Sequence, residues 1–217
     1  TSENNSDYTN SANWQEGQVP TNDGTATIVI QGTAPLTLPE GQNVSIKTLY
    51  LMQGTTVIAN GTLNASSIEI VDTSTLSGAI SVGSFTAKNL GEKTLTVNGT
   101  VTVDSMNVSG TSTSSRLTIE GSGSFNFTTK PTKHVGQFLK FEAQAPIVKT
   151  NGPAKISYSI DSAGGTNAFP SGWEIDNTFV WLGTKSEKLN EPENWEDGRI
   201  PGNGDDEVSI IVKKGNH

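Results

Sequence analysis

The strongest constraint on the fold is a series of apolar residues that occur in pairs, two positions apart, throughout residues 44–127. A spacing of two puts both members of a pair on one face of a strand, because successive side chains of a strand point to opposite sides. No window in this stretch keeps the i, i+3, i+4, i+7 spacing of an amphipathic helix. We therefore predict many short strands, centred on the pairs Val44/Ile46, Leu49/Leu51, Ile68/Ile70, Ile80/Val82, Leu95/Val97, Val101/Val103, Met106/Val108, Leu117/Ile119 and Phe125/Phe127.

Turn-prone links, among them Ser77-Gly78, separate these pairs. Two of the links, Asn60-Gly61-Thr62 and Asn98-Gly99-Thr100, are related by a sequence offset of 38 (98−60). That offset equals two coils of about 19 residues each, which is within the repeat range of solenoid proteins. Most links are longer than the two-residue turns that join antiparallel hairpins. We therefore predict an all-β fold, a right-handed parallel β-helix or β-solenoid with a strand-rich C-terminal cap. An antiparallel β-sandwich is the alternative.

Composition excludes several classes of partner. The net charge is −8 and only two arginines occur, Arg116 and Arg199, whereas binding to nucleic acid or to an anionic membrane needs clustered Lys and Arg. Cysteine is absent, which rules out disulfides and thiol chemistry. No stretch of 18 apolar residues occurs, so we expect no membrane insertion. We expect the chain to be part of a larger protein.

An octapeptide motif occurs twice, at a sequence offset of 181 (194−13). Asn13-Trp14-Gln15-Glu16-Gly17-Gln18-Val19-Pro20 returns as Asn194-Trp195-Glu196-Asp197-Gly198-Arg199-Ile200-Pro201, and Tyr8 falls on Leu189 at the same offset. A Val/Ile strand follows each copy, over residues 26–30 and 208–212. We interpret residues 1–180 as one β-solenoid repeat unit and residues 181–217 as the start of a second copy. The alternative is one domain whose two ends use a similar Trp-anchored turn.

This motif, preceded in its second copy by Trp181-Leu182-Gly183, resembles repeats of large secreted surface proteins of Gram-negative bacteria, which are adhesin-like and β-helical. The resemblance covers under a fifth of the chain. It implies a structural role, in which Trp closes the end of the apolar core and Gly and Pro shape the turn into the next strand. The positions that carry it are Asn13, Trp14, Gly17, Val19, Pro20, Trp181, Gly183, Asn194, Trp195, Gly198, Ile200 and Pro201.

Residues 130–180 have a different texture, with aromatic residues in place of many aliphatic ones. Alternating segments at 138–141, 156–160 and 179–181 predict half-buried strands. We expect outer coils or a cap over the solenoid, with the aromatics as buried anchors. A sugar-binding platform that uses Trp173 is the functional alternative.

Groups able to do chemistry are scattered. Neither His134 nor His217 has a partner pattern, and His134 is expected in a solvated loop. No spacing selects a carboxylate pair for glycosidic chemistry among the outward residues, which include Glu69, Asp104 and Glu120. The turn at residues 203–207, with Asp205, could offer oxygen ligands to calcium, but an acidic turn before a strand explains it as well.

These observations together favour a non-enzymatic, extracellular structural or adhesive segment of a larger repetitive bacterial cell-surface protein, without a cofactor. The partners expected for it are host or neighbouring-cell glycans or proteins, or other copies of itself. The strand 208–212 should cap the far end of the unit or pair with another molecule, because a free strand edge invites strand addition. The alternatives are a carbohydrate-active β-helix, either a polysaccharide lyase or a hydrolase, and a carbohydrate-binding module.

Overall fold

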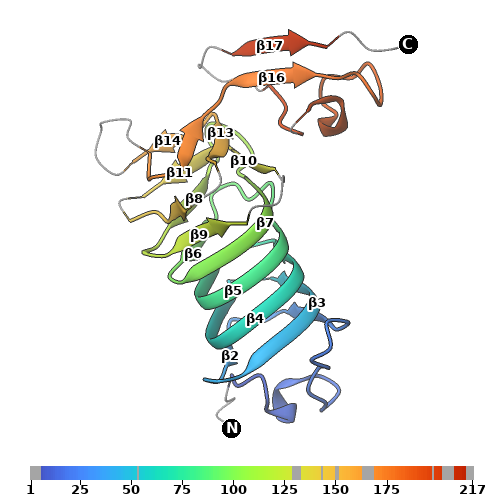
Figure 1. Cartoon of the computed structure of the whole chain (residues 1–217), viewed down its shortest axis with the longest axis vertical. Helices are drawn as coiled ribbons and strands as arrows, with labels where there is room; N and C mark the ends of the chain where they lie inside the picture. The colour runs from blue at the N-terminus through green and yellow to red at the C-terminus, as the bar shows by residue number, and fades with distance from the viewer. Residues whose placement is uncertain are drawn as a thin grey trace.

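The chain forms a parallel β-solenoid of about six turns, and the predicted parallel β-helix is thereby confirmed. The structure, a computed structural model, describes residues 6–52, 54–128, 133–142, 144–149, 152–162, 169–196, 198–201 and 208–213. The N-terminal coils lie at one end of an elongated molecule, and a separate two-stranded sheet lies across the other end (Figure 1).

The described secondary structure consists of β-strands and two 3-10 helices. The elements are η1 (Ser11–Asn13), β1 (Thr27–Ile30), β2 (Leu36–Leu38), β3 (Asn43–Leu51), β4 (Thr56–Ile70), β5 (Ser74–Ala87), β6 (Thr94–Val97), β7 (Thr100–Ser109), β8 (Leu117–Glu120), β9 (Ser124–Phe127), β10 (His134–Gln137), β11 (Leu139–Phe141), β12 (Ile147–Lys149), β13 (Ala154–Ser157), β14 (Ile160–Asp161), β15 (Trp173–Ile175), β16 (Thr178–Trp181), η2 (Pro192–Asn194) and β17 (Ser209–Val212).

Every named strand pairing in the described chain is parallel, and each joins one coil to the next. Thr62 pairs with Ala79, and Ala79 pairs with Thr100, so two successive coils have offsets of 17 (79−62) and 21 (100−79). Together they span the offset of 38 that the two Asn-Gly links predict. The coil that follows is longer, because Thr100 pairs with Ser124 at an offset of 24 (124−100).

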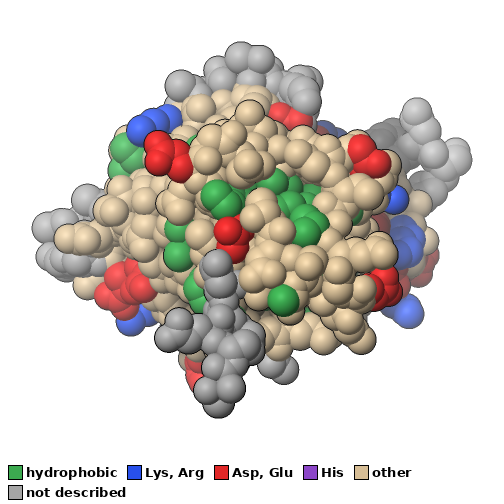
Figure 2. All heavy atoms as spheres, turned by 90° about the horizontal axis from the view of Figure 1, so that it is seen from below, with side chains coloured by type: hydrophobic (Ala, Val, Ile, Leu, Met, Phe, Trp, Pro, Cys, Tyr) green, Lys and Arg blue, Asp and Glu red, His purple; other side chains and the backbone are tan. Residues whose placement is uncertain are grey.

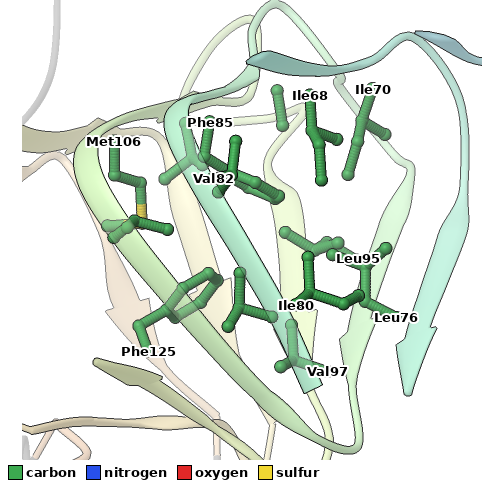
Figure 3. Packing of buried hydrophobic residues seen from close by; sticks show 14 of the residues in the cluster. Ile68, Ile70, Leu76, Ile80, Val82, Phe85, Leu95, Val97, Met106 and Phe125 are labelled. Carbon is green, nitrogen blue, oxygen red and sulfur yellow. The ribbon is translucent and has the colours of Figure 1, made fainter. Parts of the chain in front are cut away.

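The core runs along the inside of the coils. Both members of each predicted apolar pair are buried, and Figure 3 shows aliphatic and aromatic side chains from successive strands meeting in the space that the coils enclose. Burial of one such side chain stabilises the fold by about 1.5–3 kcal/mol. The alternation seen in the sequence therefore sets which face of each strand points inward.

The predicted turns at Asn60-Gly61 and Ser77-Gly78 do not end strands, which corrects the sequence interpretation. They lie inside β4 and β5, where the ladder shifts register between Ala59 and Thr62 and the strands pass round a corner. A Cβ atom added to Gly78 would lie 2.0 Å from the Ala59 carbonyl oxygen, and one on Gly99 would lie 2.1 Å from that of Gly78. Glycine is required at this corner because the backbones of successive coils approach too closely for a side chain.

The aromatic-rich region continues the coils. β10, β11 and β12 pair with β7, β8 and β9, and β13 and β14 add the next layer. The strand predicted over 138–141 begins one residue later, at Leu139, and the strand predicted over 156–160 is interrupted. The cause is the positive φ of Phe138 and Tyr158, 53° and 51°, which bends the chain at both residues. β16 and β17 then form the two-stranded sheet that caps this end (Figure 1).

Candidate functional site: the two Trp-anchored motifs

The described residues of the two octapeptide copies have the same local structure. We call residues 13–20 the first motif and residues 194–201 the second motif. Each begins at the end of a short 3-10 helix, η1 or η2, and the two helices are related by the same offset of 181 (192−11). The backbone amide of each Trp closes that helix by donating to the residue three positions earlier. The sequence repeat is therefore also a structural repeat.

The Trp and Gly residues of the two motifs make the same hydrogen bonds. The indole Nε1 of Trp14 donates to the Tyr8 carbonyl at 2.9 Å, and that of Trp195 donates to the Leu189 carbonyl at 2.9 Å. The glycine three residues after each Trp donates its amide back to the Trp carbonyl, at 2.9 Å and 3.0 Å. Both glycines have a positive φ, 65° for Gly17 and 69° for Gly198, a conformation that glycine adopts without strain.

The asparagine before each Trp anchors its motif in the same way. Asn13 Nδ2 donates to the Asp7 carbonyl at 2.8 Å, and Asn194 Nδ2 donates to the Lys188 carbonyl at 2.9 Å. A four-residue strand follows each motif: β1 starts at residue 27 and β17 at residue 209, so the offset has grown by one to 182 (209−27).

The surroundings of the two motifs differ. In the first motif, Trp14 is half-buried, packs edge-on against Tyr8 at 5.4 Å and contacts the main core. The neighbouring coil covers this region, because β1 pairs with β3 along its whole length and Ile28 is only 2% exposed. The Tyr8 hydroxyl donates to the Pro20 carbonyl at 3.1 Å, which ties the segment before the first motif to the last residue of that motif.

The second motif is enclosed by its own upstream segment. Asn194 is fully buried, and its Oδ1 accepts the amides of Lys185 and Ser186 at 2.9 Å and 3.0 Å. The Trp195 ring meets the Trp181 ring edge-on at 5.0 Å, and Gly183, with a φ of 60°, follows within the same turn. The position equivalent to Trp181 in the first copy would precede Thr1 in the sequence given.

A second apolar cluster joins the second motif to the solenoid. Tyr158, Phe179 and Trp195 form its buried centre, and Phe138 stacks on Tyr158 at 5.2 Å. Phe138 and Tyr158 are the two residues whose positive φ bends the chain, so the bends direct these rings toward the cap.

Arg199 is buried where the second motif packs on the solenoid. Its side chain is 3% exposed, lies over the Phe179 ring at 5.5 Å from the ring centroid, and pairs with Asp176 at 3.4 Å. Burial opposes ionisation of Asp176, but hydrogen bonds from Lys155 and Thr178 and the Arg199 charge outweigh it and hold the pKa of Asp176 below its usual value. The first motif has Gln18 at the equivalent position, so this ion pair is specific to the junction.

Two of the candidates for binding or chemistry are buried. Trp173 is 5% exposed, packs against Phe125 and Phe141, and donates its Nε1 to the Pro146 carbonyl at 2.7 Å. The sugar platform that used Trp173 is therefore wrong, because its ring is inside the core. The buried-anchor interpretation holds for this residue.

His134 is also buried, which corrects the expected solvated loop. It begins β10 and stacks on Phe127 with parallel rings 3.6 Å apart. Burial lowers the pKa of His134 below its usual 6.5, and the Asp104 carboxylate offsets part of this effect. The apolar Phe127 face and the parallel strand β7 hold the imidazole where a short polar loop was predicted.

The three outward carboxylates considered for chemistry lie on three different strands, β4, β7 and β8. Glu120 accepts a hydrogen bond from Thr96 at 2.8 Å, Asp104 accepts one from Thr128 at 2.7 Å, and Glu69 is exposed on β4. Within the described ranges, no group of three or more His, Cys, Asp or Glu side chains is placed to hold a metal ion. The acidic turn with Asp205 and the residue His217 lie outside the described residues. No helix among the described residues is long and apolar enough to cross a membrane.

Each end of the molecule carries a hollow beside its motif. The hollow at the N-terminal end has a volume of about 770 Å³, and its lining includes Trp14, Val19 and Ile30. Figure 2 views this end and shows apolar side chains gathered near its centre. The hollow at the C-terminal end has a volume of about 260 Å³ and is lined by Trp181, Leu189, Trp195, Pro201, Ile210 and Val212.

Comparison with protein-family models, with curated proteins and with solved structures gives no match. Sequence reasoning found the motif residues but missed the role of Arg199. One feature of the sequence could have indicated this role: Arg199 stands where the first motif has Gln18, and the acidic residue Asp176 lies upstream of it.

Proposed function

We propose that this chain is a non-enzymatic structural segment of a larger repetitive, extracellular bacterial protein, where it acts as a stalk or adhesive unit. The observation that carries the proposal is the repeated motif. Its second copy is seated on the last coils of the first unit through the cluster of Tyr158, Phe179 and Trp195. The start of one unit thus packs on the end of the preceding unit, as a tandem array requires.

The lateral surface supports a passive role. The outward faces of the central strands carry mainly Ser, Thr and Asn, and the described charged side chains are spread over different coils. Ladder-like contacts also support this surface, such as Ser67 Oγ donating to Thr48 Oγ1 at 3.0 Å between neighbouring coils. A rod of this kind is suited to spanning distance and presenting a long polar surface.

A two-unit chain tests the array directly. Because β17 follows β1 at an offset of 182 (209−27), the whole chain 1–217 should be joined directly to a second run of 36–217. This junction gives β17 the neighbour that β1 has in β3. We expect one continuous rod whose maximum dimension in solution scattering grows by about one unit and whose second motif is protected from hydrogen exchange.

The matched control joins two complete copies of the chain 1–217 through a flexible Gly/Ser linker and carries Ile210→Pro in the first copy, so that the β17 edge of that copy cannot pair with the second copy. This control should behave as two independent units, with the unfolding midpoint of the single chain. If the directly joined chain has the same midpoint, protection and dimensions as the linked control, the array proposal fails.

The enzymatic alternative needs its own test. Purified protein should leave a panel of plant, algal and host polysaccharides intact, judged by reducing ends and by absorbance of unsaturated uronates. Release of products from any one of them would support the carbohydrate-active alternative instead.

A further inference from the structure

Both ends of the molecule present a strand edge without a partner among the described residues. β1 pairs with β3 alone, and β17 pairs with β16 alone. Both strands have four residues, Thr27-Ile28-Val29-Ile30 and Ser209-Ile210-Ile211-Val212, and both run parallel to their neighbour. The two edges are therefore equivalent elements at opposite ends of one molecule.

The hydrogen bonds already made identify the backbone groups that point outward. On β1, the carbonyl of Ile30 accepts the amide of Met52, at 3.0 Å, on the β3 side. Backbone groups of successive strand residues alternate between the two sides, so the amide of Val29 points away from β3. On β17, the amides of Ser209 and Lys213 donate to β16-side carbonyls at 3.1 Å each, so those of Ile210 and Val212 point outward.

Apolar side chains lie beside both edges. At the C-terminal end, Leu189, Ile210 and Val212 are 65%, 53% and 69% exposed and line the 260 Å³ hollow. The equivalent of Ile210 in the first copy is Ile28, which is 2% exposed because a coil covers it. The C-terminal end therefore has an apolar face that its internal equivalent buries.

We propose that this face docks a second copy of the chain, with β17 of one molecule pairing in parallel with β1 of the next. A second copy fits because its N-terminal end offers both a parallel edge of the same length and an apolar hollow lined by Trp14, Val19 and Ile30. The contact joins different surfaces of the two molecules, so it propagates into open, linear assemblies.

Charge favours the head-to-tail arrangement over joining two N-terminal ends. The N-terminal end carries Asp7, Glu16, Asp23 and Glu40, and no Lys or Arg precedes Lys47 in the sequence. Two such ends brought together would repel. The inference goes beyond the proposed function, since it concerns association between separate copies of this chain.

Analytical ultracentrifugation of the whole chain over a wide concentration range tests the proposal. Val29→Pro and Ile210→Pro each remove one outward-pointing amide and leave the intramolecular ladder intact. The wild type should sediment faster as concentration rises, and each variant alone should remain monomeric. An equimolar mixture should form a 1:1 dimer and nothing larger, because each variant keeps one working end.

Val71→Lys is the matched control, since Val71 is 38% exposed after β4 and away from both ends. It should associate like the wild type. Should either proline variant lose its strand signal in circular dichroism, Val29→Lys or Val212→Lys replaces it, because charge on an edge also blocks pairing. A monomeric wild type, a monomeric mixture, or a dimer of Val29→Pro alone would each overturn the proposal. None of these outcomes affects the result of the two-unit chain.

Discussion

The first and second motifs share a backbone but not an environment. Trp14 and Trp195 make the same indole hydrogen bond six residues back, at the same 2.9 Å. Yet Asn194 is fully buried while Asn13 is exposed, and Ile28 is covered while Ile210 is open. The turn itself is therefore encoded locally, by Asn, Trp and a glycine with positive φ. Burial depends on which segments lie next to it.

The difference has a direction. Upstream residues enclose the second motif, through Trp181 and the amides that Asn194 accepts, while its downstream strand is open. For the first motif the downstream coil provides the cover, through β3. The second motif thus shows the upstream contacts, and the first motif the downstream contacts, that a motif between two complete units would have.

The largest loss of stability should come from Val101→Asp, a change in the core between the two motifs. The smaller effects expected in the motifs can be compared with it. Val101 is fully buried on β7 and a carboxylate there would face stacked aliphatic side chains. We expect the solenoid to unfold and both motifs to lose protection with it, as measured by circular dichroism and thermal melting. Thr102→Asp, on the outward face of the same strand, is the control and should fold. An unchanged melting temperature for Val101→Asp would refute the inward orientation.

Exchanging the residues that differ between the motifs should have the next largest effect. Arg199→Gln gives the second motif the residue of the first and removes the buried guanidinium from Asp176 and from the Phe179 ring. Asp176 keeps its pair with Lys155, so we expect a cost of about 1.5–3 kcal/mol. We expect the second motif to detach before the solenoid unfolds. Tryptophan fluorescence should then change at lower denaturant concentration than circular dichroism. The reciprocal Gln18→Arg, at an exposed site, should change little. Coincident transitions in Arg199→Gln would mean that the junction does not depend on this pair.

Replacing the asparagine of each motif, Asn13 or Asn194, tests how much the difference in burial contributes to stability. Asn194→Ala removes the acceptor for the amides of Lys185 and Ser186 in a buried site and should cost about 2 kcal/mol. Asn13→Ala, at an exposed position, should cost less than about 1 kcal/mol. Hydrogen exchange at Lys185 and Ser186 is the measurement for the first variant. Equal losses in both variants would argue that the upstream cover contributes nothing.

The smallest effect should come from His134, which lies between the motifs in the coils. Because burial holds its pKa below the usual 6.5, the folded protein binds fewer protons there than the unfolded chain does as pH falls below 6.5. Stability from this site is therefore present above that pH and declines as pH falls through it. His134→Phe keeps the stack on Phe127 and should flatten this part of the stability profile, measured by denaturant titration at several pH values. Parallel profiles for the two proteins would contradict the assignment.

The sequence predicted the structure best where apolar residues or turn residues recur at a regular spacing. Alternation predicted the inward residues from Val44 to Phe127 because a strand has only two faces, and the two Asn-Gly links predicted the span of two coils. It failed where tertiary contacts decide the backbone. Gly61 and Gly78 have the composition of turns, but adjacent coils hold them inside β4 and β5.

The same limit explains the errors in the aromatic region. The alternation around Phe138 and Tyr158 indicates strands, and only packing against the second motif accounts for their bent backbone. The motif residues could be predicted because their order repeats over eight consecutive positions. The apolar end face could be predicted only as a strand with a missing neighbour, since its hollow is formed by residues as distant as Trp181 and Val212.

The coil-to-coil pairing has a mechanical consequence. The named strand pairings of the described chain reach only to the adjacent coil, from an offset of 17 (79−62) between β4 and β5 to one of 31 (209−178) between β16 and β17. Tension along the long axis therefore acts in series on the hydrogen-bonded ladders that join each coil to the next. Axial tension opens hydrogen bonds that lie along the pull, and the ladders give way in sequence rather than all at once. Each coil of about 20 residues then lengthens the chain by up to about 70 Å. We therefore expect the molecule to unfold under force in many small steps, and to refold by adding coils to those that are still folded.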